Sequence, residues 1–274
     1  SMSHPSHSAR NLASEDPREM SKGCKGWFAP KFLGAEACNI CGDKFFRDAV
    51  ANSGETVFLF IHIPKSAGSS IECATKYEPI GKRWINMGHP KEKAVETCMK
   101  RCTINGKRPV KIVSVRDPYA FYVSEFCFAW DENPKHHLML PQRVQRFAGF
   151  IKEIEQLPRF EPFEKGDMTP FAQTDAISWM CGDKRLCTYD FLLRTEFLQY
   201  DWDRLNTKYG FRKPEKKLPR ENPTPARGRR GKCPETIFTR EICDFIHERD
   251  RRMFTSEFNY TKRNCDKPFE ITHK

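Results

Sequence analysis

Short apolar runs alternate with longer amphipathic stretches through most of the chain. Residues 57–63 (VFLFIHI), 110–115 (VKIVSV) and 189–194 (YDFLLR) are rich in aliphatic, β-branched or aromatic residues and lead into polar turns, so each predicts a strand. This alternation of strands and helices predicts an α/β fold. Helices are predicted at residues 68–78, 91–102, 120–130, 142–157, 171–181 and 239–254, with a further helix ending at residue 209 and a turn at residues 84–90.

We expect one folded domain with extensions, because 274 residues can bury a large core. The first two residues, Ser-Met, are typical of a cloning remnant. No apolar run approaches the ~20 residues of a membrane-spanning helix, so we expect membrane attachment only through a segment outside this sequence. The expected parts are a disordered tail (1–22), a cysteine-containing extension (23–55), the main domain (56–265) and a C-terminal tail (266–274).

The segment after the first strand has the composition of an anion-binding loop. Pro64 ends the strand, and small or hydroxylic residues with one cation lead into a helix. The amides of a first helical turn and the helix dipole favour an anion there, and small side chains let a phosphate approach closely. The order of residues differs from the Walker A pattern, because the lysine precedes the glycine. The loop consists of Lys65, Ser66, Ala67, Gly68, Ser69 and Ser70.

A second strand also ends in a polar turn followed by a helix. Arg116, Asp117 and Pro118 follow residues 110–115, and Ser124 lies about two helical turns further on. Arginine presents a planar set of donors that matches phosphate oxygens. The two strand ends together therefore predict two phosphate-binding positions.

Both motifs resemble those of sulfotransferases that use 3′-phosphoadenosine 5′-phosphosulfate (PAPS), most of all the Golgi enzymes that sulfate carbohydrates. The sequence PKSAGSS (64–70) resembles their 5′-phosphosulfate loop, and VSVRDPYAFYVSEF (113–126) resembles their 3′-phosphate motif. FAQTDAISWMC (171–181), ARGRRGKCP (226–234) and DRRMFTSEFNY (250–260) resemble three further stretches of that family. The resemblance runs discontinuously from about residue 57 to residue 260 and implies a three-layer P-loop-like fold, with a mostly parallel sheet flanked by helices.

The resemblance also implies an activity and the residues that carry it. The sulfuryl group of PAPS would move to a hydroxyl, or less readily an amine, of a carbohydrate or small molecule. Adenosine 3′,5′-bisphosphate would be the product, and no metal would be needed. Lys65 would neutralise the leaving oxygen, and the loop amides with Ser69 and Ser70 would hold the phosphosulfate. Arg116 and Ser124 would hold the 3′-phosphate, and a basic loop would close over the nucleotide with Arg229, Arg230, Gly231 and Lys232.

Sulfuryl transfer to a hydroxyl also needs a base, for which His89 is the preferred candidate. A histidine with a pKa of ~6.5 suits proton abstraction near neutral pH, and Gly88-His89 resembles the Gly-His turn that holds the base in many carbohydrate sulfotransferases. Glu92 and Glu196 are the alternatives. Glu196 is expected to cap a helix or to face the acceptor. His62, within the first strand, is expected to pack against the loop or orient it, and is a further candidate for acceptor contact.

Charge and cysteine content add two expectations. A formal charge of +11 and a pI of about 9.1 favour an anionic partner without choosing among nucleotide, glycan, nucleic acid and membrane surface; the motifs favour the nucleotide and a glycan over nucleic acid. Twelve cysteines favour disulfides in a secretory compartment such as the Golgi lumen, with Cys98–Cys102 and Cys181–Cys187 as the expected local pairs. Reduced thiols would leave a cytoplasmic location open, and the lone C-x2-C at residues 38–41 has no second motif to complete a zinc site.

Two other functions fit parts of the sequence. A P-loop-type phosphoryl transferase, such as a kinase, would share the strand–loop–helix cradle, but the chain shows no Walker A motif and no acidic strand end for magnesium. A non-catalytic protein that binds polyanions would account for the net charge. It would not account for two separate phosphate motifs at strand ends.

Overall fold

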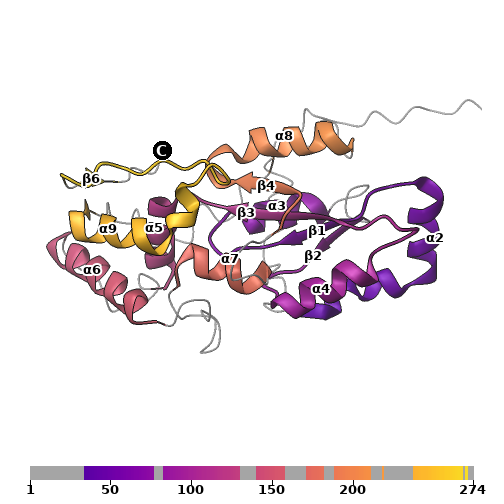
Figure 1. Cartoon of the computed structure of the whole chain (residues 1–274), viewed down its shortest axis with the longest axis horizontal. Coiled ribbons are helices and arrows are strands. Elements are labelled where there is room, and N and C mark those ends of the chain that lie inside the picture. Colours follow the sequence, from indigo (N-terminus) through magenta and orange to yellow (C-terminus); the bar gives the residue numbers. More distant parts are fainter. Residues whose placement is uncertain are drawn as a thin grey trace, which may run out of the picture.

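The structure is a computed structural model that describes residues 34–76, 83–129, 140–157, 171–181, 188–210, 218, 237–267 and 269–270. A parallel sheet with the strand order β2-β1-β3-β4 forms its centre (Figure 1). The α/β class predicted from the sequence is therefore confirmed. The strands of this sheet are β1 (Phe58–Ile61), β2 (Trp84–Asn86), β3 (Val110–Val115) and β4 (Phe191–Arg194), and a separate antiparallel pair consists of β5 (Ile237–Phe238) and β6 (Phe269–Glu270).

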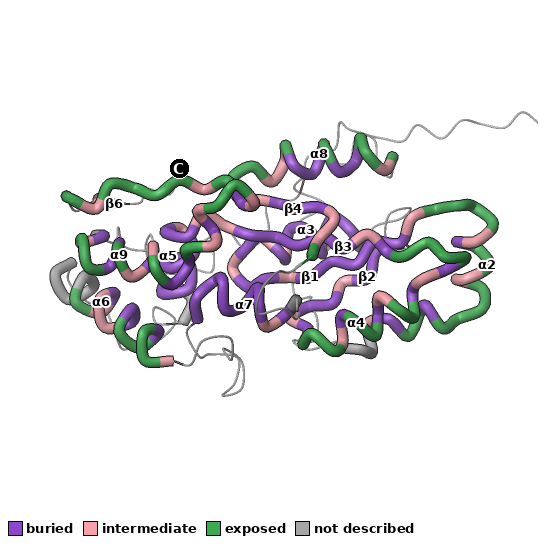
Figure 2. The backbone as a smooth tube through the Cα atoms, in the orientation of Figure 1, coloured by how far each residue is buried: buried purple, intermediate pink, exposed green. Residues whose placement is uncertain are grey.

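Helices cover both faces of the sheet. Alternate strand residues point to opposite faces, and both faces are apolar, so each packs against its own layer of helices. Leu59 and Val113 face one core, whereas Phe58 and Ile112 face a second core. The sheet and the helices against it are the most buried part of the described chain (Figure 2). The first core contains side chains of α4 (Glu92–Arg101), α5 (Pro118–Ala129), α6 (Leu140–Gln156), α7 (Gln173–Cys181) and α9 (Arg240–Arg249), and the second those of α3 (Gly68–Lys76) and α8 (Leu198–Tyr209).

The predicted elements are largely present, with one clear correction. Residues 84–90 were expected to form a turn, yet Trp84–Asn86 is strand β2, paired in parallel with β1. Three residues are too few to show a period of two, so only the pairing with β1 reveals this edge strand. The last predicted helix is divided into α9 and a 3-10 helix, η4 (Arg251–Phe254). No described helix is long and apolar enough to cross a membrane.

Two disulfides attach the N-terminal extension to α4. The extension contains a 3-10 helix, η1 (Gly34–Gly42), and α2 (Lys44–Ser53). Cys38 is bonded to Cys98 and Cys41 to Cys102. The expected Cys98–Cys102 pair is therefore wrong. Cysteines four residues apart on a helix share one face, and this face of α4 lies against η1. Each of the two cysteines on it forms a disulfide with one of the two cysteines of η1, which are three residues apart.

No free cysteine occurs among those whose side chains the structure describes. Cys243 is bonded to Cys265, and Cys73 and Cys127 are also oxidised. The expected Cys181–Cys187 pair falls outside the described residues, because Cys187 is not among them. Disulfides persist in oxidising surroundings, so these bonds indicate a compartment of the secretory pathway.

Candidate functional site

The carboxyl ends of β1 and β3 lie side by side. From β1 the chain continues through α3 to β2 on one side, whereas β3 is followed by β4 on the other side. Open parallel sheets usually bind ligands where the connections diverge in this way. Residues 62–67 follow β1 and residues 116–117 follow β3, so the two motifs singled out in the sequence meet at one edge of the sheet.

The loop after β1 has a strained backbone. Lys65 has a φ of 62° and Ala67 a φ of 60°, the left-handed region that non-glycine residues rarely adopt. The first turn of α3 begins immediately afterwards, where the amide of Ser70 donates to the carbonyl of Ala67 at 3.1 Å. Strained positions of this kind cluster at ligand-binding sites. The loop is therefore held in a conformation that its sequence alone would not favour.

His62 packs against the start of α3. Its Nδ1 lies 3.0 Å from Oε1 of Glu72, one turn into α3, and the edge of its ring lies against the Cα of Gly68. An ideal Cβ at Gly68 would lie 1.9 Å from Cδ2 of His62, so only glycine fits beneath the ring. The ring of His62 also meets that of His89 edge to face, with 4.8 Å between centroids. The two histidines expected near the loop are thus neighbours.

One buried amide joins the two strand ends. The side-chain oxygen of Gln173, at the start of α7, accepts hydrogen bonds from the amide of Arg116 at 2.7 Å and the hydroxyl of Ser66 at 3.5 Å. Its nitrogen donates to the carbonyl of Arg116 at 2.8 Å. Nη1 of Arg116 in turn donates to the carbonyl of Lys65 at 3.1 Å. Because Gln173 is fully buried, its side chain fixes the spacing between the loop and the turn.

Arg116 lies in a partly desolvated position beside a carboxylate. Burial lowers its pKa, and Glu196 acts against this shift from 4.0 Å. Its buried Nε makes no hydrogen bond to any described residue. The carboxylate of Glu196 accepts from the amide of Asp117 at 3.0 Å and from the hydroxyl of Tyr260 at 2.9 Å. Glu196 therefore holds the turn before α5, a role beyond the capping of a helix that the sequence predicts.

Two neighbouring residues of α5, Ser124 and Glu125, are buried. Ser124 is 1% exposed, and its hydroxyl makes no hydrogen bond within the described structure. Burial raises the pKa of Glu125 to about 7, and the nearby charge of Lys65 opposes this rise. A buried carboxyl group beside a candidate anion site was not expected from the sequence. Glu125 follows Ser124 directly in the sequence, but its position there does not reveal that its carboxyl group is buried.

The structure brings most of the predicted site residues together. Lys65, Ser66 and Arg116 are linked by the contacts above, and Ala67 directly precedes Gly68 to Ser70, which form the start of α3. Glu92 is exposed in the first turn of α4. The predicted basic loop falls outside the described residues, with Arg229, Arg230, Gly231 and Lys232. Sequence reasoning missed the joining role of Gln173, although the QT pair at 173–174 had been noted as a resemblance.

Comparisons of the chain with family models, with curated proteins and with solved structures find no match.

Proposed function

We propose that the protein is a PAPS-dependent sulfotransferase with a P-loop-like nucleotide site. One observation supports this proposal above the others: two separate candidate anion-binding elements lie at the carboxyl ends of adjacent parallel strands and are joined by Gln173. A nucleotide with phosphates at both the 5′ and the 3′ positions needs two such elements. A site for ATP or for a general polyanion does not need this pairing.

Each element offers donors suited to its phosphate. The phosphosulfate would lie over the loop and the first turn of α3, whose amides and helix dipole attract anions. Nε of Arg116 and the hydroxyl of Ser124 are buried without hydrogen-bond partners among the described residues. Buried polar groups are normally satisfied, so these two atoms are the natural donors to a 3′-phosphate.

The chain's own residues would have distinct roles in transfer. PAPS supplies an activated sulfuryl group, which an acceptor hydroxyl attacks in line. Lys65 would neutralise the charge that develops on the leaving oxygen, an electrostatic contribution that depends on its fixed position. His89 would accept the proton of the acceptor hydroxyl, and its neighbour His62 would hold it at the loop. A carbohydrate hydroxyl in the Golgi lumen is the acceptor that best agrees with the disulfides and the basic charge.

Calorimetric titration with nucleotides tests the binding half of this proposal. We expect wild-type protein to bind adenosine 3′,5′-bisphosphate more tightly than adenosine 5′-monophosphate or magnesium ATP. Arg116→Ala should weaken bisphosphate binding at least tenfold, because a charge-assisted contact to phosphate is lost. Arg108→Ala is the matched control: it removes the same charge at the opposite end of β3, where Arg108 pairs with Asp190 and is 60% exposed. Preference for magnesium ATP would instead indicate phosphoryl transfer.

Transfer from radiolabelled PAPS to a panel of glycans tests the catalytic half. Lys65→Ala and His89→Ala should each abolish transfer, while His89→Ala should leave bisphosphate affinity unchanged because the base does not hold the nucleotide. Full transfer activity in the Lys65→Ala variant would refute the assignment of the leaving-group cation. Salt-sensitive binding of heparin without any nucleotide binding would favour the polyanion-binding function.

A further inference from the structure

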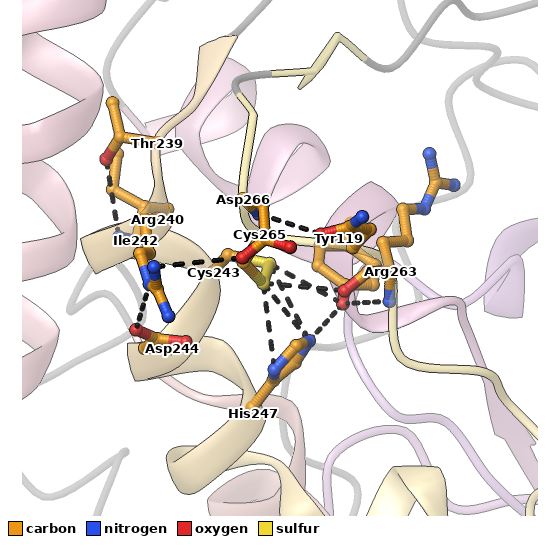
Figure 3. The surroundings of a disulfide bond; sticks show 11 residues. Tyr119, Thr239, Arg240, Ile242, Cys243, Asp244, His247, Arg263, Cys265 and Asp266 are labelled. Atoms are coloured by element: carbon orange, nitrogen blue, oxygen red, sulfur yellow. Dashed lines mark hydrogen bonds and ion pairs between the residues drawn. A yellow bond between two sulfur atoms is a disulfide. The ribbon is translucent and has the colours of Figure 1, made fainter.

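A disulfide near the C-terminus lies at the centre of a polar cluster (Figure 3). Cys243 of α9 is bonded to Cys265, and His247, one turn along α9, lies beside both sulfurs and hydrogen-bonds the hydroxyl of Tyr119. Two cysteines and a histidine at this spacing resemble a metal site. Here both sulfurs are bonded to each other in the disulfide, so the cluster attaches the segment around Cys265 to α9.

The fastened segment, residues 260–266, is named the C-terminal segment below. It contains no helix or strand, and residues 261–264 are exposed. Arg240 of α9 lies 3.7 Å from Asp266 at its far end, an exposed ion pair that contributes little. Exposed stretches without helix or strand usually fray unless they are tied down. The Cys243–Cys265 bond is therefore a covalent constraint on its position, in addition to the contacts of Tyr260 and Arg263.

The C-terminal segment lies against the turn that carries Arg116. The amide of Arg263 donates to the hydroxyl of Tyr119 at 2.8 Å, and the guanidinium of Arg263 lies 5.1 Å from the centre of the Tyr119 ring. Nη2 of Arg263 is 4.0 Å from Oδ1 of Asp117. Each of these contacts falls on residues 117–119, at the start of α5.

The other end of the C-terminal segment acts through Glu196. The hydroxyl of Tyr260 donates to Oε2 of Glu196, whose Oε1 accepts from the amide of Asp117. Burial raises the pKa of Tyr260, so this hydroxyl keeps its proton and remains a donor. One carboxylate thus couples the segment to the amide next to Arg116.

We propose that the C-terminal segment holds the Arg116–Tyr119 turn in its phosphate-binding position, with Tyr260 and Arg263 as positioning residues and the Cys243–Cys265 disulfide as the lock. The ligand of the turn rests on the proposed function above. The holding role itself does not, because it concerns only contacts within the chain. Neither positioning residue needs to touch the nucleotide.

Amide hydrogen exchange of the protein tests the holding role without any ligand. We expect the amide of Asp117 to exchange about tenfold faster, relative to amides of β3, in a Cys243→Ser/Cys265→Ser variant and in Tyr260→Phe, since the first loses a covalent constraint and the second a hydrogen bond. Tyr260→Phe keeps every disulfide, so it serves if the double variant does not fold. Cys41→Ser/Cys102→Ser is the control, because it removes another disulfide that is attached to η1 and α4. Equal relative exchange of Asp117 in Tyr260→Phe and wild type would overturn the proposal.

The ratio of affinities for adenosine 3′,5′-bisphosphate and adenosine 5′-monophosphate tests the link to the phosphate site. The two ligands differ only in the 3′-phosphate, so a general loss of stability changes both affinities alike. Tyr260→Phe should lower the ratio about tenfold, whereas the Cys41→Ser/Cys102→Ser control should leave it unchanged. A wild-type ratio near one would refute the proposed function, and the exchange experiment would still decide the holding role. A normal ratio in Tyr260→Phe would refute the positioning role.

Discussion

Replacing Gly68 with alanine should destabilise the protein through a single collision. The new Cβ would lie 1.9 Å from Cδ2 and 2.0 Å from Nε2 of His62, whereas real Cβ atoms keep at least 3.0 Å from such neighbours. The ring would have to move by roughly 1 Å, although Glu72 holds its Nδ1 and the ring of His89 lies beside it. Overpacking of this kind costs about 1–3 kcal/mol, so we expect a loss of about 2–3 kcal/mol in the free energy of unfolding.

The same substitution should have the opposite sign once the ring is removed. In a His62→Ala background the Cβ has space, and Gly68→Ala should stabilise the protein by about 0.5–1 kcal/mol, because alanine restricts the unfolded chain and favours the helix that begins there. Urea unfolding of wild type, both single variants and the double variant measures this coupling. Distant, independent sites add within about 0.5 kcal/mol. Additivity of the two substitutions would therefore refute the packing of His62 on Gly68.

Two further measurements probe burial and covalent constraint. Burial raises the pKa of Glu125 from 4.5 to about 7, so the folded state binds this proton more tightly than the unfolded state does. The free energy of unfolding should therefore fall by up to roughly 3 kcal/mol as the pH rises from 4.5 to 7. Urea unfolding of Glu125→Gln should lack this decline, and an identical decline in the variant would contradict the burial. The Cys38–Cys98 and Cys41–Cys102 bonds close almost the same loop, with sequence separations of 60 and 61 residues. Removing either bond alone should therefore lower the free energy of unfolding far less than the ~4 kcal/mol expected when both are removed. Equal and additive losses of stability in thermal unfolding would argue against this redundancy.

The two strand–turn–helix units could be predicted because their signals are local. Residues 57–63 and 110–115 are short apolar runs that end at polar turns, and Pro118 suits the first position of α5, where a missing amide proton costs nothing. The positions of Lys65 and Arg116 follow from these runs and from the general placement of sites at strand ends. That the two residues also lie close together is a finding of the structure, which pairs β1 with β3.

The contacts that hold the site could not be predicted in this way. Gln173 is 57 residues from Arg116, and Tyr260 is 64 residues from Glu196, so each contact depends on how whole elements pack. The error over Cys98 has the same origin: a nearby cysteine in sequence was preferred, although both cysteines of α4 face η1. The spacing of three residues in η1 and four in α4 was the available signal, since it places two cysteines on one face of each helix.

The contact between Tyr260 and Glu196 has a consequence for the timing of assembly during synthesis. Strand β1, the loop and Arg116 leave the ribosome before Tyr260 and Cys265, which lie more than 140 residues after Arg116 in the chain. An unfinished chain can thus form its sheet while the turn beside Arg116 still lacks its last support. Competence to bind a ligand would then follow the folding of the sheet, once oxidation of Cys243 and Cys265 attaches the C-terminal segment to α9.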